Sequence, residues 1–164
     1  KVRIARQPAS NVEQAVGRIV GSLCVVTTKK HEEISSAMLA SWVSQATFNP
    51  PGLTIAVAKD RAIESMLHSG DKLVLNVLAE GRQLRKHFMK SFAPGEDRFA
   101  NVATETSENG CPILTDALAY LECTVNNRME AGDHWIVYAI VDNGKVLNPD
   151  GVTAVHHRKS GNHY

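Results

Sequence analysis

The sequence predicts a mainly β protein, a small antiparallel barrel with a few accessory helices. Short runs rich in Val, Ile and Thr recur along its 164 residues, and such β-branched runs are typical of strands. Turn signals built from Gly, Asn and Pro separate these runs, so we expect neighbouring strands to pair as hairpins. The chain has no glycine-rich Rossmann fingerprint and no Walker loop. A nucleotide, if one binds, is therefore not held by the usual strand–turn–helix.

Bulk composition indicates one ordinary globular domain over 1–164, with 1–10 as the remnant of an upstream linker. Hydrophobic residues make up 43% and charged residues 21% of the chain, which is usual for a folded domain. A formal net charge of +1 argues against a broad nucleic-acid surface. No apolar run approaches the roughly 20 residues that cross a bilayer. We therefore expect neither nucleic-acid binding nor membrane insertion.

The cysteines favour a reducing compartment. There are three, Cys24, Cys111 and Cys123, and their odd number and wide spacing match no zinc or redox dithiol motif. We expect reduced thiols, a cytoplasmic protein and no metal site.

The first element is a predicted helix over 11–19. Ser10 and Glu13 form a capping box, in which the serine hydroxyl accepts a free amide and the glutamate reaches back. Apolar residues then recur at helical spacing and define one face: Val12, Ala15, Val16 and Ile19.

Strands follow this helix. The run 22–28 is rich in Val and Thr, and the polar stretch 29–33 is a hairpin loop. The run 35–52 returns as the second strand and stops at a turn with two prolines. A third strand, 53–58, comes directly after it.

The middle of the chain predicts two helices around a strand. Asp60 is a candidate N-cap for a short helix over 62–69, and Gly70 sits where a left-handed residue ends a helix. The run 72–77 is a strand. The basic stretch 81–92 is an amphipathic helix, with these residues facing inward: Leu84, His87, Phe88 and Phe92.

The last third returns to strands. Residues 93–116 are expected to be mostly irregular. A long strand over 118–129, a turn at 130–133 and a partner strand over 134–141 form a hairpin. Asn-Gly at the centre of 142–145 predicts a second tight turn.

One run of the sequence indicates a ligand-binding site. Residues 35–52 are crowded with small and hydroxyl-bearing side chains, whereas a core-filling strand would carry larger apolar ones. Small residues let a flat ligand lie against the backbone. Hydroxyls and an amide beside that backbone suit a phosphate or a heteroaromatic ring. We interpret the run as the segment that binds a flavin.

Three landmarks carry a family resemblance. They are the small, hydroxyl-rich run closed by 49–51, the strand 75–77, and Gly132-Asp133-His134 opening a later strand. Asp97-Arg98-Phe99 lies between them, and a basic, aromatic tail follows. This arrangement resembles the flavin reductase-like family over residues 18–164. The resemblance implies an FMN-binding split β-barrel.

A narrower resemblance lies in the continuous segment 16–46, which is similar to the carboxy-terminal flavin reductase module of flavodiiron proteins of photosynthetic organisms. It implies upstream flavodoxin-like and di-iron domains, a homodimer, and NAD(P)H-dependent reduction of FMN or FAD that feeds dioxygen reduction. The alternative is a flavin-binding electron relay or dimerisation module without hydride chemistry. Ala139 stands where many members have glycine, and its methyl narrows the space for a nicotinamide.

The resemblance and the composition together nominate cofactor contacts. Candidate contacts of the flavin ring are Ala40, Ser41, Trp42 and Val43. A core position is the alternative for Trp42. Candidate donors to the ribityl chain and phosphate are Ser44, Gln45, Ala46 and Thr47. Their alternative is a polar strand end with locally satisfied side chains.

Basic residues near the short helix are candidates for the phosphate. Lys59 is the preferred countercharge, Arg61 is the alternate, and Ser65 lies one turn into the helix. A solvated basic turn is the other interpretation. Asn76 lies inside an apolar strand and needs a partner, either a ring carbonyl or the backbone.

His134 is the candidate catalytic residue, with a role in positioning and electrostatics. The matching histidine of the family lies near the flavin and the nicotinamide, and no protein nucleophile is needed for hydride transfer. A histidine that bonds its own turn is the alternative. In the tail, His157, Arg158 and Tyr164 are expected to cover the flavin or a partner subunit. Adjacent histidines on a strand point to opposite faces, which disfavours a metal site there.

Overall fold

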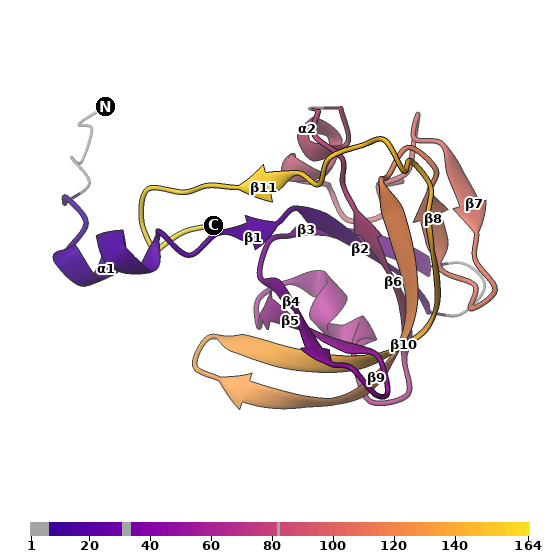
Figure 1. Ribbon diagram of the computed structural model, residues 1–164, viewed down its shortest axis with the longest axis horizontal. Helices are drawn as coiled ribbons and strands as arrows, with labels where there is room; N and C mark the ends of the chain where they lie inside the picture. Colours follow the sequence, from indigo (N-terminus) through magenta and orange to yellow (C-terminus); the bar gives the residue numbers. More distant parts are fainter. Residues whose placement is uncertain (1–6, 31–33, 82) are drawn as a thin grey trace.

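The computed structural model describes residues 7–30, 34–81 and 83–164, and its body is one antiparallel sheet of seven strands (Figure 1). In sheet order these are β3 (Ile34–Ala40), β2 (Cys24–Lys30), β6 (Lys72–Val77), β9 (Ala119–Ala131), β10 (His134–Val146), β5 (Gly52–Ala58) and β4 (Val43–Thr47). The predicted mainly β, antiparallel class is confirmed.

The sheet has to curl. Its two edge strands, β3 and β4, are consecutive in the chain, and only Ser41 and Trp42 join them. A two-residue link holds the two strand ends within about 11 Å of each other, whereas seven flat strands would lie about 29 Å across. The sheet therefore bends round until its edges meet, as in a barrel.

This geometry corrects the prediction for 35–52. The run does not form a single strand. It forms two strands at opposite edges of the sheet, with a break between them at Ser41–Trp42. A close backbone crossing marks the break, since a Cβ on Gly21 would lie 1.8 Å from the Ser41 carbonyl oxygen. The Trp42 carbonyl accepts a hydrogen bond from Ala56 N at 3.0 Å. The chain thus changes edges at the position where it touches two other strands.

Two short sheets flank the body. β7 (Thr104–Thr106) pairs with β8 (Pro112–Leu114), so 93–116 is less irregular than predicted. β1 (Gly21–Ser22) pairs with β11 (Val155–His156). The β1–β11 ribbon leads into α1 (Asn11–Val16) and the last residues, which together project from the body as an arm (Figure 1).

The helix of the arm is shorter than predicted and stays exposed. Ser10 Oγ accepts from Glu13 N at 3.2 Å, so the N-cap is confirmed. The Glu13 carboxylate accepts from Asn162 Nδ2 at 3.0 Å, which ties the helix to the tail. Most of the apolar face is uncovered within the described chain, since Val12 is 72% and Ile19 70% exposed, whereas Val16 lies against Gly161 of the tail.

Other predictions for local structure hold only in part. The predicted short helix over 62–69 forms as η1 (Ala62–Met66), a 3-10 helix that ends earlier; its N-cap is Arg61, with no side-chain cap, so the predicted cap at Asp60 is wrong. Gly70 does adopt the left-handed conformation, with φ of 88°. α2 (Gln83–Met89) occupies only the middle of 81–92. In the predicted loop over 29–33, Lys29 and Lys30 instead belong to β2, where they pair with Ser35 and Ile34. Residues 31–33 and Arg82 lie outside the described residues.

The expected tight turn at 142–145 is wrong, because these residues continue β10 beside β9. A register shift between Val141 and Asn143 absorbs one residue. Asn143 Nδ2 then donates to the buried carboxylate of Glu122 at 2.8 Å, and the opposite carboxylate oxygen accepts from Asn109 N. A bulge held by a buried acid thus replaces the turn that Asn-Gly favours locally.

The core lies on both faces of the sheet. Val26, Ile55 and Val137 belong to a cluster inside the barrel, whereas Val25 packs outside it against Phe88 of α2. Adjacent residues of β2 therefore enter different clusters, as the period-two alternation of a strand requires.

Asn76 fixes the outer cluster to the sheet. Its side chain is fully buried. The amide nitrogen donates to Val25 O at 3.1 Å and to Thr27 Oγ1 at 3.3 Å, and the amide oxygen accepts from Leu114 N at 2.9 Å. Both ends of the amide therefore have protein partners.

We expect Asn76→Ala to lower the free energy of unfolding by about 2–4 kcal/mol, because it leaves buried backbone groups without partners. Urea unfolding followed by circular dichroism measures the change. Asn127→Ala, at an exposed position of β9, is the matched control and should cost less than about 0.5 kcal/mol. Equal effects of the two variants would contradict this account.

The three cysteines should resist modification in the folded protein. All are free and buried, and burial raises the pKa of Cys24 to about 12 and that of Cys123 to about 12. Burial also raises the pKa of Cys111. Because the thiolate is the reactive form, a disulfide reagent at mildly alkaline pH should label no thiol before unfolding and three after it. Rapid labelling of the folded chain would refute this.

Candidate functional site

Two adjacent cavities lie where the arm meets the body. The first, of about 430 Å³, is bounded by β3, η1, the end of α2 with the segment after it, and the tail. The second, of about 730 Å³, lies between the end of β5, the tip of the β9–β10 hairpin and the tail. Both are lined by Trp42, Ala56, Ala58, Asp60, Arg61 and Tyr164.

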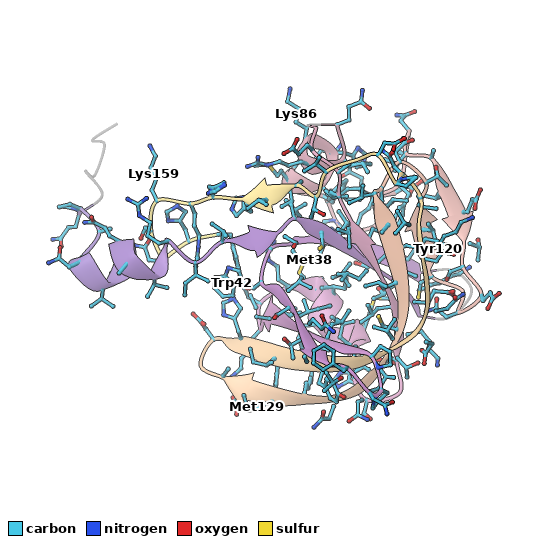
Figure 2. The ribbon with its side chains drawn as sticks, in the orientation of Figure 1. Met38, Trp42, Lys86, Tyr120, Met129 and Lys159 are labelled. Atoms are coloured by element: carbon cyan, nitrogen blue, oxygen red, sulfur yellow. The ribbon has the colours of Figure 1, made fainter. Side chains whose placement is uncertain are left out.

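An aromatic cluster is centred on Trp42, which is labelled in Figure 2, and lies between the cavities, because Trp42 and Tyr164 line both. The rings of Trp42 and His134 are stacked, with centroids 4.7 Å apart and planes at 30°. The Tyr164 ring lies 5.0 Å from Trp42, and the Arg158 guanidinium lies 5.1 Å from the Trp42 centroid. Trp42 is only partly buried, so the alternative of a core tryptophan does not hold.

His134 opens β10 after a two-residue turn at Gly132 and Asp133. Gly132 has φ of 59°, the left-handed conformation that glycine adopts without strain. His134 Nδ1 lies 2.7 Å from Asp133 Oδ1, and Nε2 contacts the Tyr164 hydroxyl. The hydrogen bond from His134 lowers the pKa of Asp133. The imidazole is thus held between its own turn and the tail, at the edge of the second cavity.

The tail completes the cluster. Arg158 donates to the carbonyls of His163 at 3.0 Å and Val16 at 3.4 Å, which links the tail and the arm to Trp42. Burial raises the pKa of the Tyr164 phenol, so it is protonated at neutral pH. The Arg61 guanidinium lies 5.6 Å from the Tyr164 ring.

The first cavity has a basic rim. Its charged lining side chains are one carboxylate, Asp60, and four cations: Arg61, Arg85, Lys90 and Arg98. Lys90 and Arg98 lie 5.3 Å and 5.0 Å from the Phe92 ring centroid. Such a rim around small residues and aromatic rings suits a planar ligand that carries phosphate.

Only some of the residues predicted to hold the flavin line a cavity. Ala40, Ser41 and Trp42 line the first cavity, whereas Val43 packs against the core inside the barrel. The four residues predicted for the ribityl chain and phosphate lie farther along β4 and line neither cavity: Ser44, Gln45, Ala46 and Thr47. Ser44 Oγ donates to Gln45 O and Thr47 Oγ1 to Pro50 O, which are local bonds of a polar strand end.

Of the residues predicted near the phosphate, two line a cavity and one does not. Arg61 lines both cavities. Lys59 lines the second, where it forms an ion pair with Glu130 and lies 5.2 Å from the Trp135 ring. Ser65 Oγ donates to Ala62 O, outside both cavities.

Asn76 was expected to pair with either a ring carbonyl or the backbone, and its partners include backbone atoms of the protein. It lies outside both cavities. His157 is exposed and lines neither cavity, whereas the neighbouring His156 lines the first. Ala139 is fully buried in the inner core and lines neither cavity. Its methyl group therefore takes no space from either.

Sequence reasoning missed several lining residues, among them Met38, Lys90, Phe92 and His156. The first cavity is lined by the whole run 36–42, so Met38 lines it together with Ala40 to Trp42, and no local pattern of the sequence showed this. For His156, the only signal was the pair of adjacent histidines, of which one must face inward on a strand.

Within the described residues, no helix combines the length and the apolar character needed to cross a membrane.

Comparisons with known proteins agree with this geometry. A profile of the "Flavin reductase like domain" matches residues 16–162. Diflavin flavoprotein A 1 of Synechocystis sp. is 60% identical over 166 residues, covering 100% of this chain and 29% of that protein. A relative of the same diflavin flavoprotein A series from Nostoc sp. is 74% identical with the same coverage.

Solved structures share the fold. The NADH:FAD oxidoreductase SgcE6 of Streptomyces globisporus aligns with a TM-score of 0.81 at 26% identity, over 92% of this chain and 94% of that one. Flavin reductase HpaC, solved with NADP+, aligns with a TM-score of 0.76 at 23% identity, over 89% and 92%.

The chain spans about 29% of the length of the cyanobacterial relatives described above. With a profile match over most of its length and the same fold as these reductases, this chain belongs to the flavin reductase-like domain family.

Proposed function

We propose that this chain is an FMN-binding module that takes electrons from NAD(P)H and passes them to flavodoxin-like and di-iron domains of a longer flavodiiron polypeptide, where dioxygen is reduced. The observation that carries the proposal is the pair of adjacent cavities with a shared wall at Trp42, Arg61 and Tyr164. Two neighbouring sites are what hydride transfer between two bound ring systems needs.

The residues fit a flavin mononucleotide. Ala37, Ala40 and Ser41 present small side chains to the first cavity, so a planar ring can approach the backbone of β3. The cavity volume lies in the range of small-molecule sites. Arg61 and Arg85 at the rim supply positive charge for a phosphate.

A bound flavin would supply the capacity to accept a hydride and release electrons singly. The chain's residues bind, orient and shield. Trp42 and Tyr164 cover the junction of the cavities and exclude water from it. His134, fixed by Asp133 and Tyr164, places a polar ring at that junction. No covalent nucleophile is required.

A second candidate function is electron relay without hydride transfer. Trp42 and Tyr164 line both cavities, so two aromatic rings stand where a flavin and a nicotinamide would have to meet. Electron transfer tolerates such a wall, whereas hydride transfer needs the two reacting rings in contact.

A homodimer accords with the exposed apolar side chains of the arm, since Val12, Ile19 and Val20 are each at least half exposed. The three free buried thiols accord with the cytoplasm. We propose both on these grounds, together with a single domain over 1–164.

The first test is FMN titration of the purified chain, followed by quenching of flavin fluorescence. Wild-type protein should bind at micromolar levels. Arg61→Ala should weaken binding about tenfold or more, because a charge-assisted contact to phosphate is lost. Lys86→Ala is the control, since Lys86 is exposed, lines neither cavity and points away from the body (Figure 2). Absence of quenching with wild-type protein would defeat the proposal.

The second test distinguishes an NAD(P)H-dependent reductase from an electron relay that performs no hydride transfer. NADH or NADPH added without oxygen should bleach the absorbance of bound FMN. His134→Ala should slow this bleaching at least severalfold while changing the Kd for FMN little, because His134 lines the second cavity and not the first. His68→Ala, at an exposed position outside both cavities, should behave like wild type. Bound flavin that stays oxidised with both nucleotides would establish the relay instead.

A further inference from the structure

His156 is a half-buried histidine that no other part of the fold explains. It lies on β11, opposite Gly21 in the register of the two-stranded ribbon. Its side chain lines the first cavity. The Nδ1 atom is buried and is the one buried side-chain nitrogen or oxygen of the described residues that lacks a hydrogen-bond partner.

A buried polar atom without a partner is costly. Leaving such a group unsatisfied costs roughly 1–3 kcal/mol relative to a paired one, and most buried polar side-chain atoms in proteins are paired. Elsewhere in this chain the rule holds, since Asn76 and Glu122 use both ends of their polar groups. A ligand in the cavity is the natural source of the missing partner.

The imidazole is neutral near neutral pH. Burial lowers the pKa of His156, and the positive charges of Arg85 and Arg158 lower it further. His157 acts in the same direction, and a backbone hydrogen bond with Tyr164 opposes the shift. A neutral imidazole has one nitrogen that donates and one that accepts. Because Nδ1 has no partner, Nε2 is the donor to Tyr164, and Nδ1 is left to accept a hydrogen bond from a ligand.

We propose that His156 is a flavin-binding residue, whose Nδ1 forms a hydrogen bond with a polar atom of FMN held in the first cavity. This rests on the proposed function, because the flavin is the ligand assigned to that cavity. The sequence had favoured His157 for the same task. His157 lies directly after β11, where it is exposed and lines neither cavity.

The test uses three variants of the whole chain: His156→Phe, His156→Asn and His157→Phe. Phenylalanine keeps the size and planarity of the ring and removes its nitrogens. Asparagine carries a polar atom on Cγ, where Nδ1 sits in histidine. His157→Phe is the matched control one residue away. For each we would measure the Kd for FMN, the visible spectrum of the bound flavin, and the Tm of the flavin-free protein.

We expect His156→Phe to weaken FMN binding about tenfold and to shift the flavin spectrum. It should leave the Tm of the flavin-free chain unchanged or raised, because an unpaired polar atom has been removed. His156→Asn should recover part of the affinity. His157→Phe should match wild type in all three measurements.

Wild-type affinity in His156→Phe would overturn the inference and leave the proposed function intact. A lower Tm in flavin-free His156→Phe, with normal FMN affinity, would make the ring structural and also overturn it. Unchanged FMN binding with weaker use of NADPH would assign the ring to the nicotinamide and contradict the flavin assignment. Failure of wild-type protein to bind FMN would instead defeat the proposed function itself.

Discussion

The two-residue link at Ser41–Trp42 sets the geometry on which the rest of this molecule depends. It joins the opposite edges of a seven-stranded sheet, so the sheet cannot remain open. The link is held on both sides: the Trp42 carbonyl bonds to β5, and the Ser41 carbonyl lies where a side chain at Gly21 would sit. The same link therefore both closes the barrel and fixes the position of the Trp42 ring.

That position gathers distant parts of the chain. His134 comes from the tip of the longest hairpin, Arg158 and Tyr164 come from the tail, and all three meet the Trp42 ring. Each is anchored again elsewhere, His134 on Asp133 and Arg158 on the carbonyl of Val16. The site is thus built from rigid strand ends and one tail, with the two cavities formed on either side of a shared aromatic wall.

Local pattern was enough to predict most of the strands, because period-two alternation and turn residues act within a few positions. It failed where tertiary contacts outweigh local preference. Asn143 and Gly144 favour a turn by themselves, yet the buried carboxylate of Glu122 draws Asn143 into a bulge. The small-residue run did mark the site, but the sequence could not show that the chain changes sheet edges within it. Ala40 to Trp42 consequently lie at the cavity, and Ser44 to Thr47 follow an outer edge. For His156 on β11 and His157 directly after it, the choice between faces depended on a two-residue strand too short to predict.

The placement of the two tryptophans gives the molecule an optical property. The sequence contains only Trp42 and Trp135; Trp42 stacks on His134, and Trp135 is the next residue along β10, with the Arg128 guanidinium 4.2 Å from its ring. All of the chain's indole emission therefore originates at the end of the barrel that carries the cavities. Flavins absorb in the wavelength range where indoles emit, so a cofactor in this position would quench both rings by energy transfer. The native fluorophores thereby report cofactor occupancy without any attached label.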